Sequence, residues 1–182
     1  MFALLLACTG ASSPEAPPPP PPRPPDVLVV VLDTARADAF SAYGNPRATS
    51  PQLDALAAAG VLFEDATAPG SWTWPSHASL FTGEFPWVHG AHFGEPGEGA
   101  VALEPDPFYA TAMREDLPTL AERFAAAGYR TVSLSANRLL TPALGLTRGF
   151  EDARTLAEDE LVVAAAGEVL AADDDRPVFL FV

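Results

Sequence analysis

Two unbroken apolar runs, residues 27–32 and 177–182, have the pattern of strands buried on both faces of a sheet. β-Branched residues and leucine without polar alternation are typical of parallel strands that helices cover on each side. Residues 61–66 and 130–135 are also expected to form strands.

Helical patterns separate these strands. Residues 51–59 place Leu53, Leu56 and Ala57 at helical spacing, and Gly60 follows as a stop signal. Three further helices are predicted, over residues 75–82, over residues 117–127 with Asp116 as N-cap, and from the capping-box pair Thr155 and Glu158 to about residue 172.

The alternation of strands and helices predicts an α/β fold with a mostly parallel sheet and helices on both faces. Residues 26–182 are long enough for one such domain with a core. Residues 84–115 are rich in Gly and Pro and are expected to form a long excursion from the sheet.

The first 25 residues differ in character from this domain. Residues 1–8 are apolar and end in Leu-Ala-Cys, which resembles a bacterial lipobox with Cys8 as the lipidated residue; the alternative is a chance apolar N-terminus. Residues 9–25 hold nine prolines and predict a semi-rigid polyproline II linker, or alternatively a ligand for a proline-binding module. A lipid anchor followed by a spacer predicts an extracytoplasmic protein on a bacterial membrane, periplasmic or at the cell surface.

Charge, cysteine content and hydropathy argue against several classes of protein. The net charge is −14, from 24 acidic and 10 basic residues, so binding to nucleic acid is disfavoured. The single cysteine excludes a disulfide framework and a cysteine-based zinc cluster. The longest apolar run is much shorter than the roughly 20 residues that cross a bilayer. Membrane contact is therefore expected only through the anchor on Cys8.

The candidate functional residues lie near the end of a predicted strand and the start of a predicted helix. Asp33 follows the first strand, where ligands bind in open α/β sheets. Thr73 lies near the N-terminus of the helix that Pro75 opens, where an anion is favoured, and His77 lies on the same first turn. A metal held by Asp33 would activate the Thr73 hydroxyl as a nucleophile. The alternative is that Thr73 or Ser76 only caps the helix and His77 is a surface histidine.

Four segments, residues 26–38, 50–63, 74–83 and 128–137, together resemble the N-terminal half of the sulfatase family in the alkaline phosphatase superfamily. The similarity covers nearly all of residues 26–182 in the expected order. It implies an alkaline-phosphatase-like fold, apparently truncated, and the hydrolysis or transfer of sulfate or phosphate esters. The implied substrates are small molecules or glycan or lipid esters.

The resemblance also implies roles for individual residues. Asp33 matches the first metal-binding carboxylate, and Thr34 stands where many sulfatases carry a second Asp. Thr73 matches the catalytic nucleophile, which is otherwise a Cys or Ser that becomes formylglycine. His77 replaces an Arg that supports the modified residue, and Asn137 falls where a Lys commonly touches substrate. The expected metal ligands are Asp33, Thr34 and Thr73, the catalytic residues Thr73 and His77, and the substrate-binding residue Asn137.

Threonine at the nucleophile position changes the expected mechanism. Threonine is not a known substrate of the oxidation that makes formylglycine, so a direct threonine alkoxide is expected, as in lipoteichoic acid synthase-like and phosphoethanolamine transferase-like relatives. The implied cofactor is a divalent cation, Ca, Mg, Mn or Zn.

The remaining metal ligands of the family come from later strands, so this sequence is expected to contain about half of an active site. His89 and His92 are further candidates for the site. A hard cation takes about six oxygen ligands, which Asp33 and Thr73 alone do not supply. Three interpretations stay open: a metal-dependent ester hydrolase or transferase, a non-catalytic surface lipoprotein, and an inactive fragment.

Overall fold

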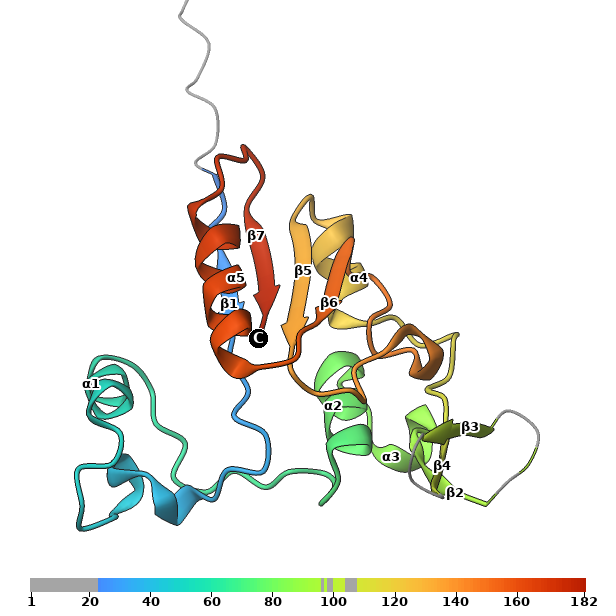
Figure 1. Ribbon diagram of the computed structural model, residues 1–182, viewed down its shortest axis with the longest axis horizontal. Helices are drawn as coiled ribbons and strands as arrows, with labels where there is room; N and C mark the ends of the chain where they lie inside the picture. Colours follow the sequence, from blue (N-terminus) through green and yellow to red (C-terminus); the bar gives the residue numbers. More distant parts are fainter. Residues whose placement is uncertain (1–22, 96, 98–99, 104–107) are drawn as a thin grey trace, which may run out of the picture.

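The computed structural model describes residues 23–95, 97, 100–103 and 108–182, and its centre is a four-stranded parallel sheet (Figure 1). The strands lie in the order β1 (Val27–Val29), β7 (Val178–Phe181), β5 (Arg130–Ser135) and β6 (Asp152–Thr155). β7 is the last strand in the chain, yet it pairs with β1 on one side and with β5 on the other. The predicted parallel α/β fold is confirmed.

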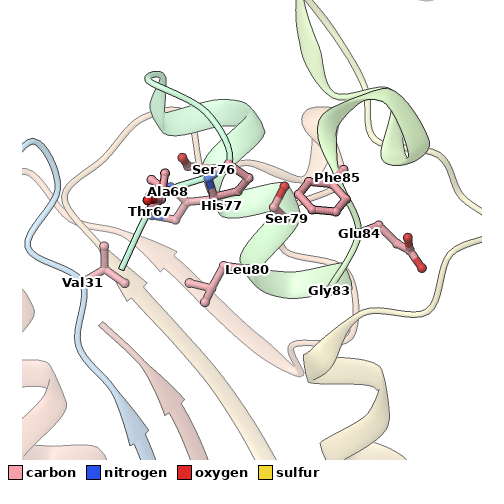
Figure 2. Close-up of a pocket in the computed structure, with 11 residues that line it drawn as sticks. Val31, Thr67, Ala68, Ser76, His77, Ser79, Leu80, Gly83, Glu84 and Phe85 are labelled. Carbon is pink, nitrogen blue, oxygen red and sulfur yellow. The ribbon is translucent and has the colours of Figure 1, made fainter. Parts of the chain in front are cut away.

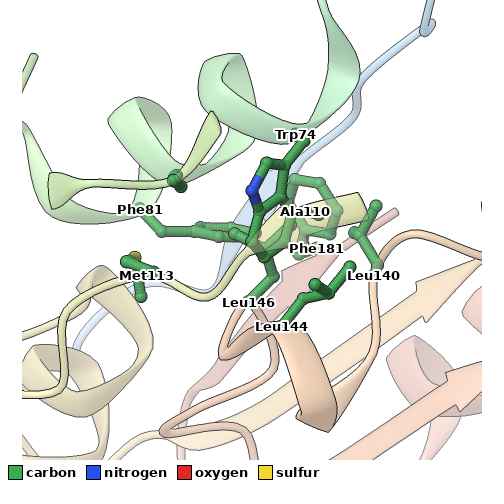
Figure 3. Packing of buried hydrophobic residues seen from close by; sticks show 10 residues of the cluster. Trp74, Phe81, Ala110, Met113, Leu140, Leu144, Leu146 and Phe181 are labelled. Atoms are coloured by element: carbon green, nitrogen blue, oxygen red, sulfur yellow. The ribbon is translucent and has the colours of Figure 1, made fainter. Parts of the chain in front are cut away.

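Helices cover both faces of this sheet. One face carries α5 (Asp159–Ala171), and the opposite face carries α2 (Thr73–Thr82) and α4 (Leu120–Ala126). Successive side chains of a strand point to opposite faces, so Leu180 of β7 packs in the cluster with α5. Phe181 packs with Trp74 and Phe81 of α2 (Figure 3). The two clusters together form the core.

Residues 84–115 contain more regular structure than the sequence predicts. They form α3 (Pro86–His89) and a three-stranded antiparallel sheet in the order β2 (His92–Gly94), β4 (Phe108–Thr111) and β3 (Ala100–Leu103). The other elements are α1 (Pro51–Ala59) and the 3-10 helices η1 (Ala37–Ala39), η2 (Ser41–Tyr43) and η3 (Pro142–Leu144). Figure 1 shows α1, η1 and η2 away from the parallel sheet.

The prediction of a strand at residues 61–66 is wrong. These residues have no regular structure, and Phe63 is 70% exposed. A strand needs a partner for its backbone N–H and C=O groups, and no ladder in the described part of the chain includes them. The first strand is also shorter than expected, although Val31 N still donates to Val182 O at 2.8 Å.

The helix caps of α4 and α5 differ from the prediction. α4 begins at Leu120, with Thr119 rather than Asp116 as N-cap. Thr119 Oγ1 accepts from Glu122 N at 3.1 Å, and Glu122 Oε2 accepts from Thr119 N at 2.7 Å, which is a complete capping box. The pair expected to cap α5 does not form such a box, because Thr155 ends β6 and Glu158 is an N-cap without a side-chain bond.

The predicted lipidation site Cys8 and residues 9–22 of the linker lie outside the described residues. None of the described helices is both long and apolar enough to cross a bilayer.

Replacing Phe181 with Ala tests the role of β7 in the core. Phe181 is 1% exposed and lies 4.9 Å from the ring of Phe81. We expect Phe181→Ala to lower the free energy of unfolding by about 3–5 kcal/mol in urea titrations, because it leaves a cavity. Phe63→Ala is the matched control on an exposed ring and should stay within about 0.5 kcal/mol of wild type. Equal losses in the two variants would contradict this core.

Candidate functional site

Three predicted site residues meet at the carboxyl end of the parallel sheet. Asp33 follows β1, Asn137 follows β5, and Thr73 is the first residue of α2. Thr73 Oγ1 donates to Asp33 Oδ2 at 2.9 Å, and Asn137 Nδ2 donates to the same oxygen at 2.7 Å. Asp33 therefore orients both neighbours through one carboxylate oxygen.

The strand order explains why Asp33 and Asn137 meet. β1 and β5 both pair with β7, so their carboxyl ends lie at the same edge of the sheet, roughly 10 Å apart at about 4.8 Å per strand. The Asn137 side chain spans this gap. Its amide orientation is fixed, because Oδ1 accepts from Leu139 N at 2.8 Å while Nδ2 donates to Asp33. The main-chain N of Asn137 donates to Ser135 Oγ at 2.9 Å.

Thr34 has an unusual backbone conformation beside Asp33. Its φ is 59°, in the left-handed region that a β-branched residue rarely adopts. The tight turn after β1 is closed by a bond from Ala35 N to Leu32 O at 3.2 Å. Such strain persists where the surrounding structure imposes it, and it is concentrated at functional sites. The turn brings Thr34 to the same cleft as Asp33 and Thr73.

This cleft has a volume of about 620 Å³. Its apolar walls come from the segment after β1 (Val30, Val31 and Leu32), from α5 (Val162 and Val163) and from Val182 after β7. Its polar members are Asp33, Thr34, Thr73, Ser135, Asn137 and Asp159. The ionisable groups among its lining residues are the carboxyl groups of Asp33 and Asp159. Two carboxylates in one cleft attract a cation. The charge of the cleft therefore favours a cation.

Asp159 was not among the predicted site residues. It is the first residue of α5 and directly follows the loop after β6. Asp159 could have been predicted in the same way as Asp33, because both are acidic residues just beyond the carboxyl end of a parallel strand. It was missed because the β6 strand has a polar sequence that does not predict a strand.

The structure does not bring His77 into this cleft. His77 is 6% exposed, so the alternative of a surface histidine is wrong. Its Nδ1 donates to the Thr73 main-chain oxygen at 2.8 Å, and its ring lies 5.9 Å from that of Phe181. It lines a second, largely apolar pocket of about 450 Å³ together with Ser76 and Leu80 of α2 (Figure 2). His77 therefore contacts the backbone of Thr73 rather than its hydroxyl.

The helix-capping alternative is also not what the structure shows. The N-cap of α2 is Trp72, which makes no side-chain cap bond. Thr73 donates its hydroxyl to Asp33, and Ser76 donates its own to Gly70 O at 2.7 Å. Neither hydroxyl is used to accept from the N–H groups of the first turn.

The other two histidines lie away from the cleft. His89 is fully buried, its Nδ1 accepts from Ala91 N at 3.1 Å, and its Nε2 therefore carries the proton that contacts Ser79 Oγ at 2.9 Å. Burial lowers the pKa of His89, so its neutral form joins α2 to α3. His92 is exposed on β2.

The donor atoms of the cleft are of the type that a hard divalent cation binds, but they are too few to complete its coordination. Asp33 and Thr73 offer carboxylate and hydroxyl oxygens of the kind that Mg²⁺ and Ca²⁺ prefer, and Thr34 lies beside them. Among the residues that the structure describes, however, no group of three or more His, Cys, Asp or Glu side chains could hold a metal ion. Water or donors outside the described residues would have to complete the coordination.

Comparison with known protein families assigns the chain to the alkaline phosphatase superfamily. The sequence profile of the family described as Sulfatase matches residues 25–182. The chain belongs to the sulfatase family. Members of this family typically use a divalent metal.

Individual relatives agree with this assignment. Arylsulfatase A of Bos taurus is 39% identical over 110 residues, which cover 58% of this chain and 19% of that protein. The chain thus spans about a fifth of the length of the curated relatives it matches.

Two solved structures share the fold. One is a complex of the protein BT4656 with its substrate D-glucosamine-2-N,6-O-disulfate, with a TM-score of 0.65, 18% identity and coverage of 86% of this chain and 33% of that one. The other is the phosphonate monoester hydrolase of Agrobacterium radiobacter, with a TM-score of 0.60, 20% identity and coverage of 87% and 40%.

Burial of neutral His89 predicts a pH dependence of stability. The folded state lowers the pKa of His89 from its ordinary value of 6.5, so the unfolded chain takes up this proton at higher pH than the folded chain. The stabilisation is complete above pH 6.5 and is lost as the pH falls through the folded-state pKa. Thermal melts of wild type and His89→Gln between pH 7.5 and pH 5 measure it. We expect the wild type to lose more stability on acidification than the variant, and parallel curves would contradict this.

Proposed function

We propose that this protein is a metal-dependent hydrolase of sulfate or phosphate esters with Thr73 as its nucleophile. The observation that carries the proposal is the Thr73 hydroxyl, which lies at the N-terminus of α2 and donates to Asp33 at 2.9 Å. Membership of the sulfatase family supports the class of ester. The solved relative that binds a disulfated glucosamine supports a glycan as the esterified molecule.

Asp33, Thr34 and Thr73 would hold the divalent cation, which can be Ca, Mg, Mn or Zn. When bound, such a cation lowers the pKa of the threonine hydroxyl and offsets the repulsion between the anionic ester and the cleft carboxylates. The pair of Asp33 and Asp159 in one cleft supports this need for positive charge.

Thr73 Oγ1 attacks the central sulfur or phosphorus of the ester. A bond forms from Oγ1 to that atom, and the bond to the leaving alcohol oxygen breaks. The hydroxyl proton moves to Asp33 Oδ2, which already accepts it in a hydrogen bond, and then to the departing alcohol. Water then attacks the covalent ester on Thr73, which releases sulfate or phosphate and restores the hydroxyl.

The anionic oxygens of the ester need donors. The first turn of α2 presents backbone N–H groups and the positive end of the helix dipole to them. The Asn137 amide nitrogen carries two hydrogens, of which one is donated to Asp33. We assign the second to an ester oxygen, so Asn137 binds substrate and aligns Asp33 at once.

His77 enters this proposal as a positioning residue. Its Nδ1–H holds the main-chain oxygen of Thr73, and its ring is fixed against Phe81 and Phe181. The contact fixes the first turn of α2 and so the direction of the Thr73 side chain.

The location of the protein is a separate proposal. A lipid on Cys8 and the linker of residues 9–25 would hold the domain outside the cytoplasm, on a bacterial membrane. Its test is expression of wild type and Cys8→Ser in a bacterial host, followed by fractionation. We expect wild type in the membrane fraction and the variant in the soluble fraction, and soluble wild type would contradict the anchor.

Thr73→Ala tests the nucleophile. With 4-nitrophenyl sulfate and 4-nitrophenyl phosphate as substrates and each divalent metal added in turn, we expect turnover to fall by roughly 10⁴-fold or more. Thr73→Ser keeps a hydroxyl and should retain part of the activity. Thr82→Ala is the matched control, because Thr82 lies at the other end of α2 and donates to Ala78 O. Retained activity in Thr73→Ala would refute the assignment, and a wild type that hydrolyses neither ester would favour a non-catalytic protein.

Asp33→Ala tests the metal site separately. Removal of the carboxylate should weaken binding of the added divalent metal by about 10-fold or more in calorimetric titrations, because a charged oxygen ligand is lost. Asp38→Ala is the control, since Asp38 lies on η1 and its exposed carboxylate pairs with Arg36. Equal metal affinity in Asp33→Ala and wild type would contradict the assignment.

A further inference from the structure

Arg23 binds the end of the proline-rich linker to the edge of the parallel sheet that lies opposite the cleft. Its guanidinium donates to the main-chain oxygens of Asp175 at 3.2 Å and of Arg176 at 2.7 Å, in the loop between α5 and β7. It also forms an ion pair with Asp26 Oδ1 at 3.0 Å. One side chain therefore joins the linker to the loop that leads into the central strand.

Two further hydrogen bonds hold the same part of the chain. Asp26 Oδ1 accepts from Val178 N at 2.8 Å, and Tyr129 Oη donates to Pro25 O at 3.2 Å. The N–H of Val178 and the Arg23 guanidinium hold the pKa of Asp26 below its ordinary value, which keeps this carboxylate charged at neutral pH. The last residues of the linker are thus bound at the amino ends of β7 and β5.

The cleft lies at the other end of these strands. β1 begins at Val27, and Asp33 follows its carboxyl end, so at about 3.3 Å per residue the two residues are roughly 20 Å apart. All four strands are parallel, which puts their amino ends at one edge of the sheet and their carboxyl ends at the opposite edge. Figure 1 shows β7 and β5 pointing from the first edge toward α2. The linker and the cleft therefore lie at opposite ends of the domain.

The sequence of the linker favours a stiff extension from Arg23. Residues 17–22 are consecutive prolines, and polyproline II rises about 3.1 Å per residue and keeps its direction over several residues. At this rise, the chain from Cys8 to Arg23 would span about 45 Å. A membrane attached at Cys8 would then lie beyond the amino ends of the strands, on the side away from Asp33.

We propose that Arg23 sets the orientation of the domain on its membrane, so that the cleft opens away from the bilayer and accepts esters of molecules outside the membrane rather than esters of membrane lipids. This inference rests on the proposed function and on the proposed anchor at Cys8. The net charge of −14 supports it, because an anionic bilayer repels the domain and disfavours an arrangement in which it lies flat on the lipids.

A spin label next to Arg23 tests the contacts of its side chain. Cys8 is the single cysteine, so the nitroxide is attached to Cys8→Ser/Pro22→Cys, and the paramagnetic resonance spectrum reports its mobility. We expect a slow spectral component that Arg23→Ala abolishes and Arg36→Ala keeps. Arg36 is the matched control, because it is an exposed arginine that pairs with Asp38. A spectrum that Arg23→Ala leaves unchanged would overturn the proposal.

The orientation is measured on vesicles. Wild type is coupled through Cys8 to a maleimide lipid in phosphatidylcholine vesicles that contain a dansyl lipid, so native lipidation is not needed. Energy transfer from tryptophan is recorded, because Trp72, Trp74 and Trp87 lie on α2, its N-cap and α3, at the cleft end of the domain. We expect no more transfer than from uncoupled protein.

A shortened linker makes the same measurement sensitive to Arg23. In protein that lacks residues 17–22, we expect Arg23→Ala to raise the transfer and Arg36→Ala to leave it unchanged. High transfer in wild type would overturn the proposal, and so would equal transfer with and without Arg23→Ala in the shortened protein.

Access of substrate is the last measurement. A synthetic lipid with an aryl sulfate or aryl phosphate headgroup is supplied in detergent micelles to uncoupled wild type, or within the vesicles to which wild type is coupled, with added divalent metal. We expect hydrolysis in the micelles and a loss of hydrolysis in the vesicles, and equal hydrolysis in both would overturn the proposal. If wild type hydrolyses no ester in either form, the proposed function fails, while energy transfer still decides the orientation.

Discussion

The insertion of β7 between β1 and β5 is the constraint on which the rest of the structure depends. Leu180 stands in register with Leu28 on one side and with Val132 on the other. The ladder continues past the strand end, because Val182 N donates to Val29 O at 2.9 Å and Val31 N donates to Val182 O at 2.8 Å. This order places the carboxyl ends of β1 and β5 two strand spacings apart, which is close enough for Asn137 to reach Asp33.

The same strand connects the core to the candidate nucleophile. The ring of Phe181 lies against His77, and His77 donates to the main-chain oxygen of Thr73. On the other face, Leu180 packs in the cluster that holds α5, the helix whose first residue is Asp159. Both walls of the cleft thus depend on side chains of a single strand, and packing of the sheet fixes the geometry of the site.

Local patterns in the sequence predict the elements that are held by local forces and by burial. The helix at Pro51–Ala59 and the strand at Arg130–Ser135 have the predicted bounds. β6 could not be predicted, since its sequence DART is polar and its strand conformation comes from pairing with β5. The prediction of a strand at residues 61–66 is wrong for the opposite reason. Its sequence is apolar enough for a strand, but these apolar side chains are not buried in the described structure.

The candidate site likewise contains residues that local patterns predict and contacts that only the tertiary structure determines. Asp33 and Thr73 could be predicted because strand ends and helix N-termini are favoured positions for chemistry. The bond from Asn137 to Asp33 could not, since it joins residues 104 positions apart and depends on strand order. The burial of His77 against Phe181 also follows from packing, because spacing alone fits a place beside the Thr73 hydroxyl equally well.

The central claim is that Thr73 forms a covalent ester during turnover. Acid quenching within the first turnover, followed by proteolysis and mass spectrometry, measures this directly. We expect the peptide containing Thr73 to gain the mass of one phosphoryl or sulfuryl group, and the same peptide of Thr73→Val to gain none. Turnover of the ester without any adduct on Thr73, or an adduct on another residue, would contradict it.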